Sequence, residues 1–105
     1  MTMLVTADAV RRAAASIAGH VLHTPSVDSP GLAAVLGRPV ALKLEILQMS
    51  GCFKPRGIVN KVLSLTEAER ASGLLTVTGG NHGIAIGTPC RCLACQCQAG
   101  YEQRK

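Results

Sequence analysis

The sequence is almost without aromatic residues: it has no Trp, one Tyr and one Phe among 105 residues. Proteins that bind single-stranded nucleic acid usually stack the bases on several aromatic rings. Basic residues outnumber acidic ones by 11 to 6, a formal net charge of +5, but they are scattered and form no continuous stripe. We therefore predict no nucleic-acid partner, while a nonspecific attraction to anions stays open.

Long apolar runs are also absent. No run approaches the ~18–20 residues that are needed to span a bilayer. Near the N-terminus, Asp8 interrupts the would-be hydrophobic stretch and Arg11-Arg12 follows it, which is the reverse of a secretory signal. The sequence thus predicts no membrane partner and a cytoplasmic location.

A chain of 105 residues allows at most one small domain. In its first half, the spacing of apolar residues predicts two helices and a strand. Apolar residues at helical spacing predict an amphipathic helix over residues 6–19, and a shorter one over residues 32–36 that ends at Gly37. Residues 40–44 alternate between apolar and other side chains, which predicts a half-buried strand.

The second half continues the alternation. Pro55 suits the first turn of a helix, and residues 58–65 supply an apolar face. Thr66 with Glu69 forms a capping-box pattern for a further short helix that closes near Gly73. Residues 74–78 are β-prone and run into a glycine-rich turn. This order predicts an α/β fold with parallel strands.

Lys54 lies between the only phenylalanine, Phe53, and Pro55, at a predicted junction of loop and helix. Backbone N–H groups and the helix dipole raise the positive potential at such a junction. This potential favours the neutral amine that a Schiff base requires. On spacing alone, a surface lysine near a helix start is the commoner explanation.

The glycine-rich turn, residues 79–83, has the sequence Gly-Gly-Asn-His-Gly. Glycines let backbone N–H groups approach an anion such as a carboxylate or a phosphate, and a helix start adds its dipole. A plain tight turn with Asn81 in a left-handed conformation would produce the same pattern, so this motif alone leaves both explanations open.

Taken together, the two motifs resemble those of a known family. They read Glu45-x-x-x-x-Ser50-Gly51-Cys52-Phe53-Lys54-Pro55-Arg56-Gly57 and Thr78-Gly79-Gly80-Asn81-His82-Gly83. The pair resembles the N-terminal part of fold-type II pyridoxal-phosphate enzymes, specifically the threonine/serine dehydratase group. The flanking His23-Thr24-Pro25 and Leu42-Lys43-Leu44-Glu45 resemble the same group, and the likeness covers about residues 6–87.

The resemblance implies a truncated part of the fold-type II (tryptophan synthase beta-like) open parallel-sheet domain, with pyridoxal 5'-phosphate as cofactor. It also implies an ammonia-lyase that converts L-threonine or L-serine to a 2-oxo acid and ammonia. Lys54 matches the lysine that holds the cofactor and takes the substrate α-proton, Phe53 the residue against the cofactor ring, and Asn81 the partner of the ring hydroxyl. The loop that grips the substrate carboxylate is matched by five residues: Thr78, Gly79, Gly80, Asn81 and His82.

Two positions depart from the pattern of this group. Cys52 stands where Ser or Ala is common, a small-for-small change that packing tolerates. Gly79 stands where racemases of the group have a serine that acts as acid and base, and since glycine has no side-chain proton to give, elimination is expected over racemisation. The group's glycine-rich phosphate loop and its polar partner for the pyridine nitrogen have no counterpart here, so we expect weak cofactor retention and a chain that is inactive if these contacts are essential.

The composition changes after about Gly87. Residues 88–105 hold four of the five cysteines and no hydrophobic period. We predict the N-terminal portion of a dehydratase-like domain over residues 1–87 and a Cys-rich, unstructured tail over residues 88–105. The tail cysteines, Cys90-x-Cys92-x-x-Cys95-x-Cys97, would suit zinc or an iron–sulfur cluster chemically, but zinc sites separate their cysteine pairs by a longer loop, so no metal site is predicted.

A noncatalytic role is the alternative to an enzyme. The apolar faces of the helices near residues 8–18 and 58–65 are normally covered by the remainder of such a fold. Without that remainder, exposed apolar patches favour self-association, or docking of the fragment on a full-length homologue.

The change in composition also makes a prediction at the level of DNA. Family members continue after the position of Ile86 with an Ala-rich helix, whereas this chain changes character at Gly87. If a frameshift, a gene-model error or a disrupted gene caused the change, another reading frame of the coding DNA past Ile86 should encode that helix. Resequencing and translation in all frames provide the measurement, and a lack of any family-like continuation would contradict this origin.

Overall fold

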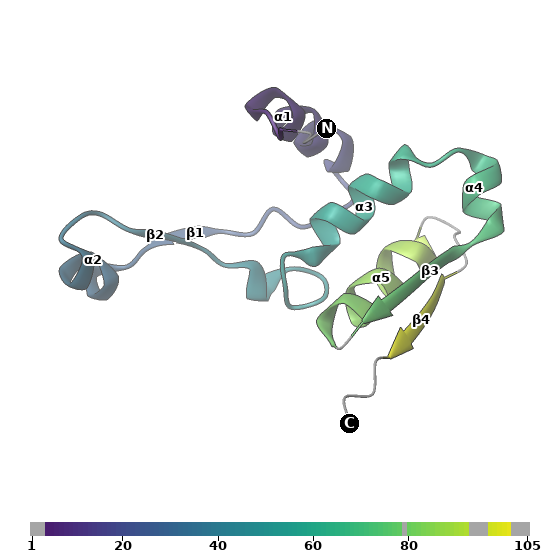
Figure 1. Ribbon diagram of the computed structural model, residues 1–105. Helices are drawn as coiled ribbons and strands as arrows, with labels where there is room; N and C mark the ends of the chain where they lie inside the picture. The colour runs from purple at the N-terminus through teal and green to yellow at the C-terminus, as the bar shows by residue number, and fades with distance from the viewer. Residues whose placement is uncertain (1–3, 79, 93–96, 102–105) are drawn as a thin grey trace.

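The computed structural model describes residues 4–78, 80–92 and 97–101, and side chains are described through Gly87. Helix α3 lies at the centre, with α1 against one side and α5 against another (Figure 1). The elements in chain order are α1 (Ala7–Ile17), β1 (Ser26–Asp28), α2 (Pro30–Leu36), β2 (Ala41–Lys43), the 3₁₀ helix η1 (Glu45–Leu47), α3 (Lys54–Ser64), α4 (Glu67–Ser72), β3 (Leu74–Thr78), α5 (Asn81–Cys92) and β4 (Cys97–Tyr101).

Strands β3 and β4 are parallel and are connected through α5, which packs against both of them. Their register runs from Leu74 opposite Cys97 to Thr78 opposite Tyr101. A parallel pair needs such a crossover, because a tight turn can join only antiparallel strands. This β-α-β unit confirms the predicted α/β class with parallel strands.

The same unit reaches beyond the predicted end of regular structure. Helix α5 continues past Gly87 to Cys92, and β4 spans Cys97–Tyr101. Secondary structure therefore extends into residues 88–105, where the sequence predicts an unstructured tail. A strand at a sheet edge is held by main-chain hydrogen bonds, which need no apolar period in its sequence. The side chains of Cys90, Cys92, Cys95 and Cys97 lie outside the described residues.

Strands β1 and β2 form a separate antiparallel ribbon that projects from the body, with α2 at its far end (Figure 1). The expectation of parallel strands fails here because α2 sits at the tip of the ribbon instead of crossing over its face. The expected half-burial of β2 is also wrong, since all three of its residues are exposed. The projection accounts for a radius of gyration of 16.6 Å, against about 13 Å for a compact domain of this length.

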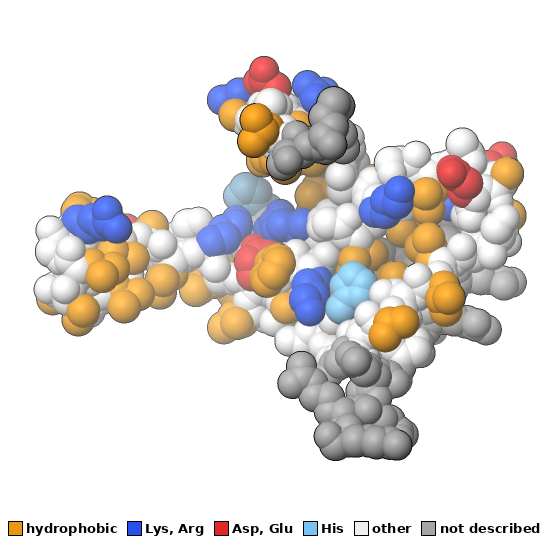
Figure 2. All heavy atoms as spheres, viewed as in Figure 1, with side chains coloured by type: hydrophobic (Ala, Val, Ile, Leu, Met, Phe, Trp, Pro, Cys, Tyr) orange, Lys and Arg blue, Asp and Glu red, His pale blue; other side chains and the backbone are white. Residues whose placement is uncertain are grey.

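Capping residues define both ends of helix α2, although the helix lies on the exposed ribbon. Ser29 Oγ accepts a hydrogen bond from the Leu32 N–H, and Gly37 ends the helix with a φ of 65°. The helix buries none of its own residues, and apolar side chains gather at this end of the molecule (Figure 2).

The hydrophobic core joins α3 to α5. Its buried cluster consists of Ile58 and Val62 from α3 with Ala85 and Ile86 from α5. Leu74 of β3 packs against the cluster and is itself half-buried. The predicted apolar face of residues 58–65 is therefore largely buried, with Leu63 and Leu65 only half-buried at its end.

Helix α1 contributes much less to the core. Ile17 is its only buried residue, and Val10 is exposed although it lies on the predicted apolar face. Helix α4 confirms the predicted capping box, because Thr66 Oγ1 accepts from the Glu69 N–H at 3.2 Å and the Glu69 carboxylate accepts from the Thr66 N–H at 2.7 Å. Gly73 ends α4 with a φ of 87°.

Two isoleucines of α5 provide a matched test of this core. Ile86 is 7% exposed and Ile84 is 62% exposed. Ile86→Val should lower the free energy of unfolding by about 0.5–1.5 kcal/mol, because it leaves a small cavity in the cluster. Ile84→Val should change it by less than about 0.5 kcal/mol. Urea titrations followed by circular dichroism measure both, and equal losses would contradict the assigned core.

Candidate functional site

Lys54 is the first residue of α3 and follows a loop, residues 48–53, in which Gly51 has a φ of 70°. Pro55 occupies the first turn and is buried, which fixes the helix direction close to the lysine. Lys54 itself is half-buried, and its side chain has no hydrogen bond or ion pair with the described residues. Phe53 lies just before it with its ring largely exposed. The junction predicted from the sequence is thus present.

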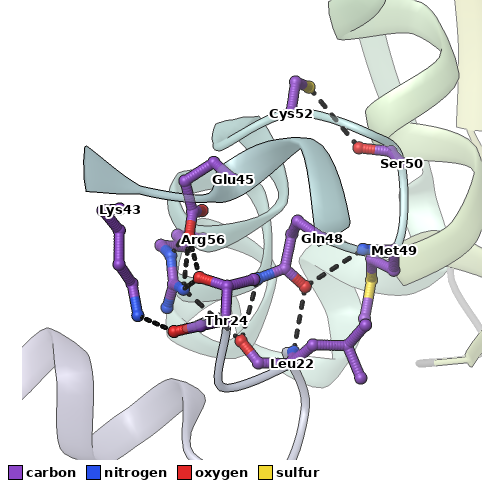
Figure 3. A network of polar contacts seen from close by, with 9 residues as sticks. All are labelled: Leu22, Thr24, Lys43, Glu45, Gln48, Met49, Ser50, Cys52 and Arg56. Atoms are coloured by element: carbon purple, nitrogen blue, oxygen red, sulfur yellow. Dashed lines mark hydrogen bonds and ion pairs between the residues drawn. The ribbon is translucent and has the colours of Figure 1, made fainter. Parts of the chain in front are cut away.

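Arg56, in the same first turn of α3 as Lys54, forms an ion pair with Glu45 (Figure 3). Arg56 Nε donates to Glu45 Oε2 at 2.8 Å, and Arg56 Nη2 donates to Glu45 Oε1 at 2.8 Å, so both carboxylate oxygens are engaged. Thr24 donates its hydroxyl to Glu45 Oε1 at 2.5 Å and is almost fully buried. Two-point pairing of this kind is the strongest hydrogen-bonded arrangement of arginine with a carboxylate.

A second set of hydrogen bonds surrounds the ion pair. The buried Gln48 side chain accepts from the Leu22 N–H at 2.9 Å and donates to the Leu22 carbonyl at 2.9 Å. Lys43 Nζ donates to the Thr24 carbonyl (Figure 3). The segment around residues 22–24 is therefore attached to η1 and to α3. The sequence showed the Thr24, Glu45 and Arg56 motifs individually, but nothing in their spacing indicated that they meet.

The network changes the acidity of Glu45. Hydrogen bonds from Arg56 and Thr24, with the positive charges of Arg56 and Lys43, lower the pKa of Glu45 from 4.5 to about 2 against the opposing effect of partial burial. The same hydrogen bond raises the pKa of Arg56. Both groups stay charged across the physiological range, so the ion pair is permanent there.

Cys52 precedes the Phe53-Lys54 pair and packs against the buried cluster of α3 and α5. Its Sγ lies 3.5 Å from Ser50 Oγ (Figure 3). That contact, followed by a hydrogen bond from the Lys54 backbone N–H, lowers the pKa of the thiol. Cys52 is half-buried at this place.

The second motif lies at the junction of β3 and α5. Thr78 is 6% exposed, and its Oγ1 accepts from the Gly80 N–H at 3.1 Å and the Gly83 N–H at 3.3 Å. The Gly80 N–H belongs to the loop expected to hold a substrate carboxylate, and the N–H groups of both Gly80 and Gly83 are satisfied internally. Asn81 is exposed and His82 is half-buried. Gly79 lies outside the described residues.

The two motifs flank one core. Cys52, two residues before Lys54, packs on the cluster that contains Ala85 and Ile86, four and five residues after Asn81. Helices α3 and α5, which begin at Lys54 and Asn81, are in contact. The fold thus brings together the two segments that the sequence singled out.

Two cavities lie elsewhere in the described part of the chain. One of about 360 Å³ is bounded by the end of α1 and residues 21–23, with Lys43 and Arg56 in its wall. The other, of about 310 Å³, lies between α2 and the ribbon. Neither is lined by Lys54, Phe53 or Asn81.

None of the described helices combines the length and the apolar character that crossing a membrane demands.

Comparison with known proteins decides the family. Residues 17–102 match the family described as pyridoxal-phosphate dependent enzyme. The chain belongs to this family. Its architecture is an α/β fragment of the fold-type II pyridoxal-phosphate enzymes, as the sequence motifs predicted.

Relatives in this pyridoxal-phosphate family include dehydratases and racemases. The chain is 39% identical over 84 residues to L-threonine dehydratase biosynthetic IlvA of Mycobacterium tuberculosis, covering 80% of this chain and 20% of the relative. It is 36% identical over 77 residues to a serine racemase of Oryza sativa subsp. indica, covering 73% and 23%. The structure of maize serine racemase superposes with a TM-score of 0.82 at 29% identity, covering 97% of this chain and 32% of that one. The chain thus spans about a quarter of the length of the curated relatives.

The ion pair makes a prediction about pH. Because the pKa of Glu45 is lower in the folded chain than its ordinary value of 4.5, ionised Glu45 stabilises the fold above pH 4.5, and this contribution is lost as the pH falls toward 2. The urea midpoint of the wild type should therefore fall through this window. Glu45→Gln should be less stable near neutral pH and should show a weaker fall below pH 4.5.

The control for this measurement is Glu67→Gln, which removes an exposed carboxylate of α4. It should retain the wild-type dependence on pH. A Glu45→Gln variant with the same dependence as the wild type would show that the ion pair does not contribute to acid sensitivity.

Proposed function

We propose that this chain carries the cofactor-binding lysine, Lys54, of a pyridoxal-phosphate-dependent ammonia-lyase that acts on L-threonine or L-serine. The position of Lys54 carries the proposal: its amine has no described partner, and it lies at the start of α3. That helix is anchored by the Glu45–Arg56 pair and contacts α5. Because the chain spans about a quarter of its curated relatives, activity of the chain itself is part of the proposal.

The residues present fit the aldehyde end of the cofactor. A primary amine is the group that forms a Schiff base with an aldehyde, and the Lys54 amine is available for this bond. When bound, pyridoxal phosphate supplies an electron sink for the charge that forms at the substrate α-carbon. Phe53 would pack against the ring of the cofactor, and Asn81 would hydrogen-bond its ring hydroxyl.

The protein residues then have distinct tasks in the proposed reaction. Lys54 Nζ, once replaced by the amino group of the substrate, takes the α-proton. The substrate also loses its β-hydroxyl, so that one molecule of water leaves in total. Hydrolysis of the released enamine then consumes one molecule of water and gives a 2-oxo acid and ammonia. Residues 78–82 would hold the substrate carboxylate through backbone N–H groups.

Elimination is proposed over racemisation because of Gly79. Racemisation needs a second acid on the opposite face of the α-carbon, and glycine has no side chain that could donate a proton. Relatives named as dehydratases and as serine racemases both match this chain, so this residue is the argument for the dehydratase.

A noncatalytic fragment is the second candidate, and the exposed face of β3 favours it. Leu75 is 80% exposed and Val77 is 71% exposed, and they alternate with the less exposed Leu74, Thr76 and Thr78. An apolar sheet face open to solvent is typical of an interaction surface. Self-association or docking on a full-length homologue would cover it.

Trapping of the cofactor tests the first candidate. The purified chain is mixed with pyridoxal phosphate, reduced with borohydride and analysed by peptide mass spectrometry. We expect one label per chain, at Lys54, and its loss in Lys54→Ala. Lys61→Ala serves as the matched control, because it removes an exposed lysine from the other end of the same helix.

Selective labelling of Lys54 would be followed by an assay for 2-oxo acid formation from threonine and serine. Label scattered over several lysines and unchanged in Lys54→Ala would contradict the first candidate. Sedimentation at several concentrations then measures the second, which requires association that increases with concentration.

A further inference from the structure

Helix α3 begins without the side-chain cap that the other α-helices with a described N-cap possess. Thr6, Ser29 and Thr66 each accept a hydrogen bond from a backbone N–H in the first turn of α1, α2 and α4. Phe53 occupies the corresponding position of α3 and makes no such bond. The Lys54 N–H bonds the Cys52 thiol and the Arg56 N–H donates to the Phe53 carbonyl at 3.2 Å, but the N-cap side chain adds no bond of its own. A first turn without an N-cap side-chain bond frays more easily. Lys54 lies in this turn.

Arg56 restrains this turn in a different way, by donating hydrogen bonds to other segments of the chain. It lies two residues after Lys54 in the same turn, and its guanidinium reaches away from the helix to Glu45, Thr24 and the Leu22 carbonyl. The bonds to Glu45 are both 2.8 Å, and those to Thr24 and Leu22 are 3.3 and 3.4 Å. These partners belong to segments 11 to 34 residues distant in sequence. The first turn of α3 is therefore fixed from outside the helix.

We propose that Arg56, acting through Glu45 and Thr24, is the positioning residue of Lys54: it holds the first turn of α3 so that the lysine leaves the helix in one direction. This inference rests on the proposed function of Lys54. Arg56 is not placed on the cofactor or the substrate, and its effect passes through the backbone of residues 54–56.

The geometry requires arginine in particular. A planar guanidinium meets both oxygens of a carboxylate in parallel, and its Nη2 also lies within hydrogen-bond distance of Thr24 and Leu22. A lysine amine is a single point charge on a flexible stem. The Arg56 and Glu45 side chains are 32% and 17% exposed, so the pair is only partly screened by water. Arg56→Lys should keep the charge and lose the orientation.

The test compares three variants with the wild type in the complete chain. Arg56→Lys and Glu45→Gln change the network. Ile58→Val lowers stability through the buried core of the same helix and leaves the network intact. Circular dichroism first confirms that each variant is folded at the working temperature, and should Arg56→Lys not fold, Glu45→Gln supplies the comparison.

Two readouts are taken. The first is a ratio of labelling rates. The rate at which pyridoxal phosphate and borohydride label Lys54 is divided by the rate for Lys61, which lies two turns further along α3. The second is amide hydrogen exchange of a peptide covering residues 53–60, which needs no cofactor. Arg56→Lys should lower the Lys54 to Lys61 ratio by about 10- to 100-fold and accelerate exchange in the first turn of α3. Ile58→Val should leave the ratio unchanged.

The outcomes separate the inference from the proposed function. A wild type that is labelled selectively at Lys54, with the same ratio and exchange in Arg56→Lys as in Ile58→Val, would overturn the positioning role and leave the proposed function in place. A wild type without selective labelling, whose exchange nevertheless depends on Arg56, would overturn the proposed function and leave Arg56 as the residue that fixes the start of α3.

Discussion

The bidentate pair between Glu45 and Arg56 is the interaction on which the arrangement of the first half of the chain depends. It connects η1 to α3, and through Thr24 it also connects the segment between α1 and β1. Removing either partner would leave the other charge partly buried without compensation, which costs more than the pair itself contributes. The charged pair therefore connects segments that a larger domain would hold together through a more extensive apolar core.

The apolar core is small and one-sided. Its buried cluster comes from α3 and α5, and neither α1 nor the ribbon contributes a residue to it; Ile17 of α1 is buried outside this cluster. A chain of this length buries a modest share of its surface, so a few side chains decide its stability. The start of α3 lies where this core meets the polar network, because Cys52 contacts the first and Arg56 belongs to the second. Lys54 lies between Cys52 and Arg56 in sequence, so the apolar core and the polar network restrain the backbone on either side of it.

Local structure was predictable from the sequence, and contacts between distant segments were not. The capping box of Thr66 and Glu69, the end of α2 at Gly37 and the start of α3 beside Pro55 each depend on residues within one helical turn. The alternation at residues 40–44 indicated a strand correctly, but a period of two does not say what covers its faces, and here nothing among the described residues buries β2. The Thr24–Glu45 bond spans 21 residues, so only the folded chain reveals it. The strand at Cys97–Tyr101 was missed for a similar reason, because its partner β3 is distant in sequence.

The hydroxyl of Thr78 has a consequence for any anion that arrives at the start of α5. The N–H groups of Gly80 and Gly83 already have an acceptor, so a carboxylate that used them would replace one oxygen by another. Such an exchange conserves the number of hydrogen bonds, and its net free energy is the difference between a charged and a neutral acceptor, which is smaller than the strength of either bond alone. The two hydrogen bonds to the Thr78 hydroxyl also hold the turn between β3 and α5 in its conformation.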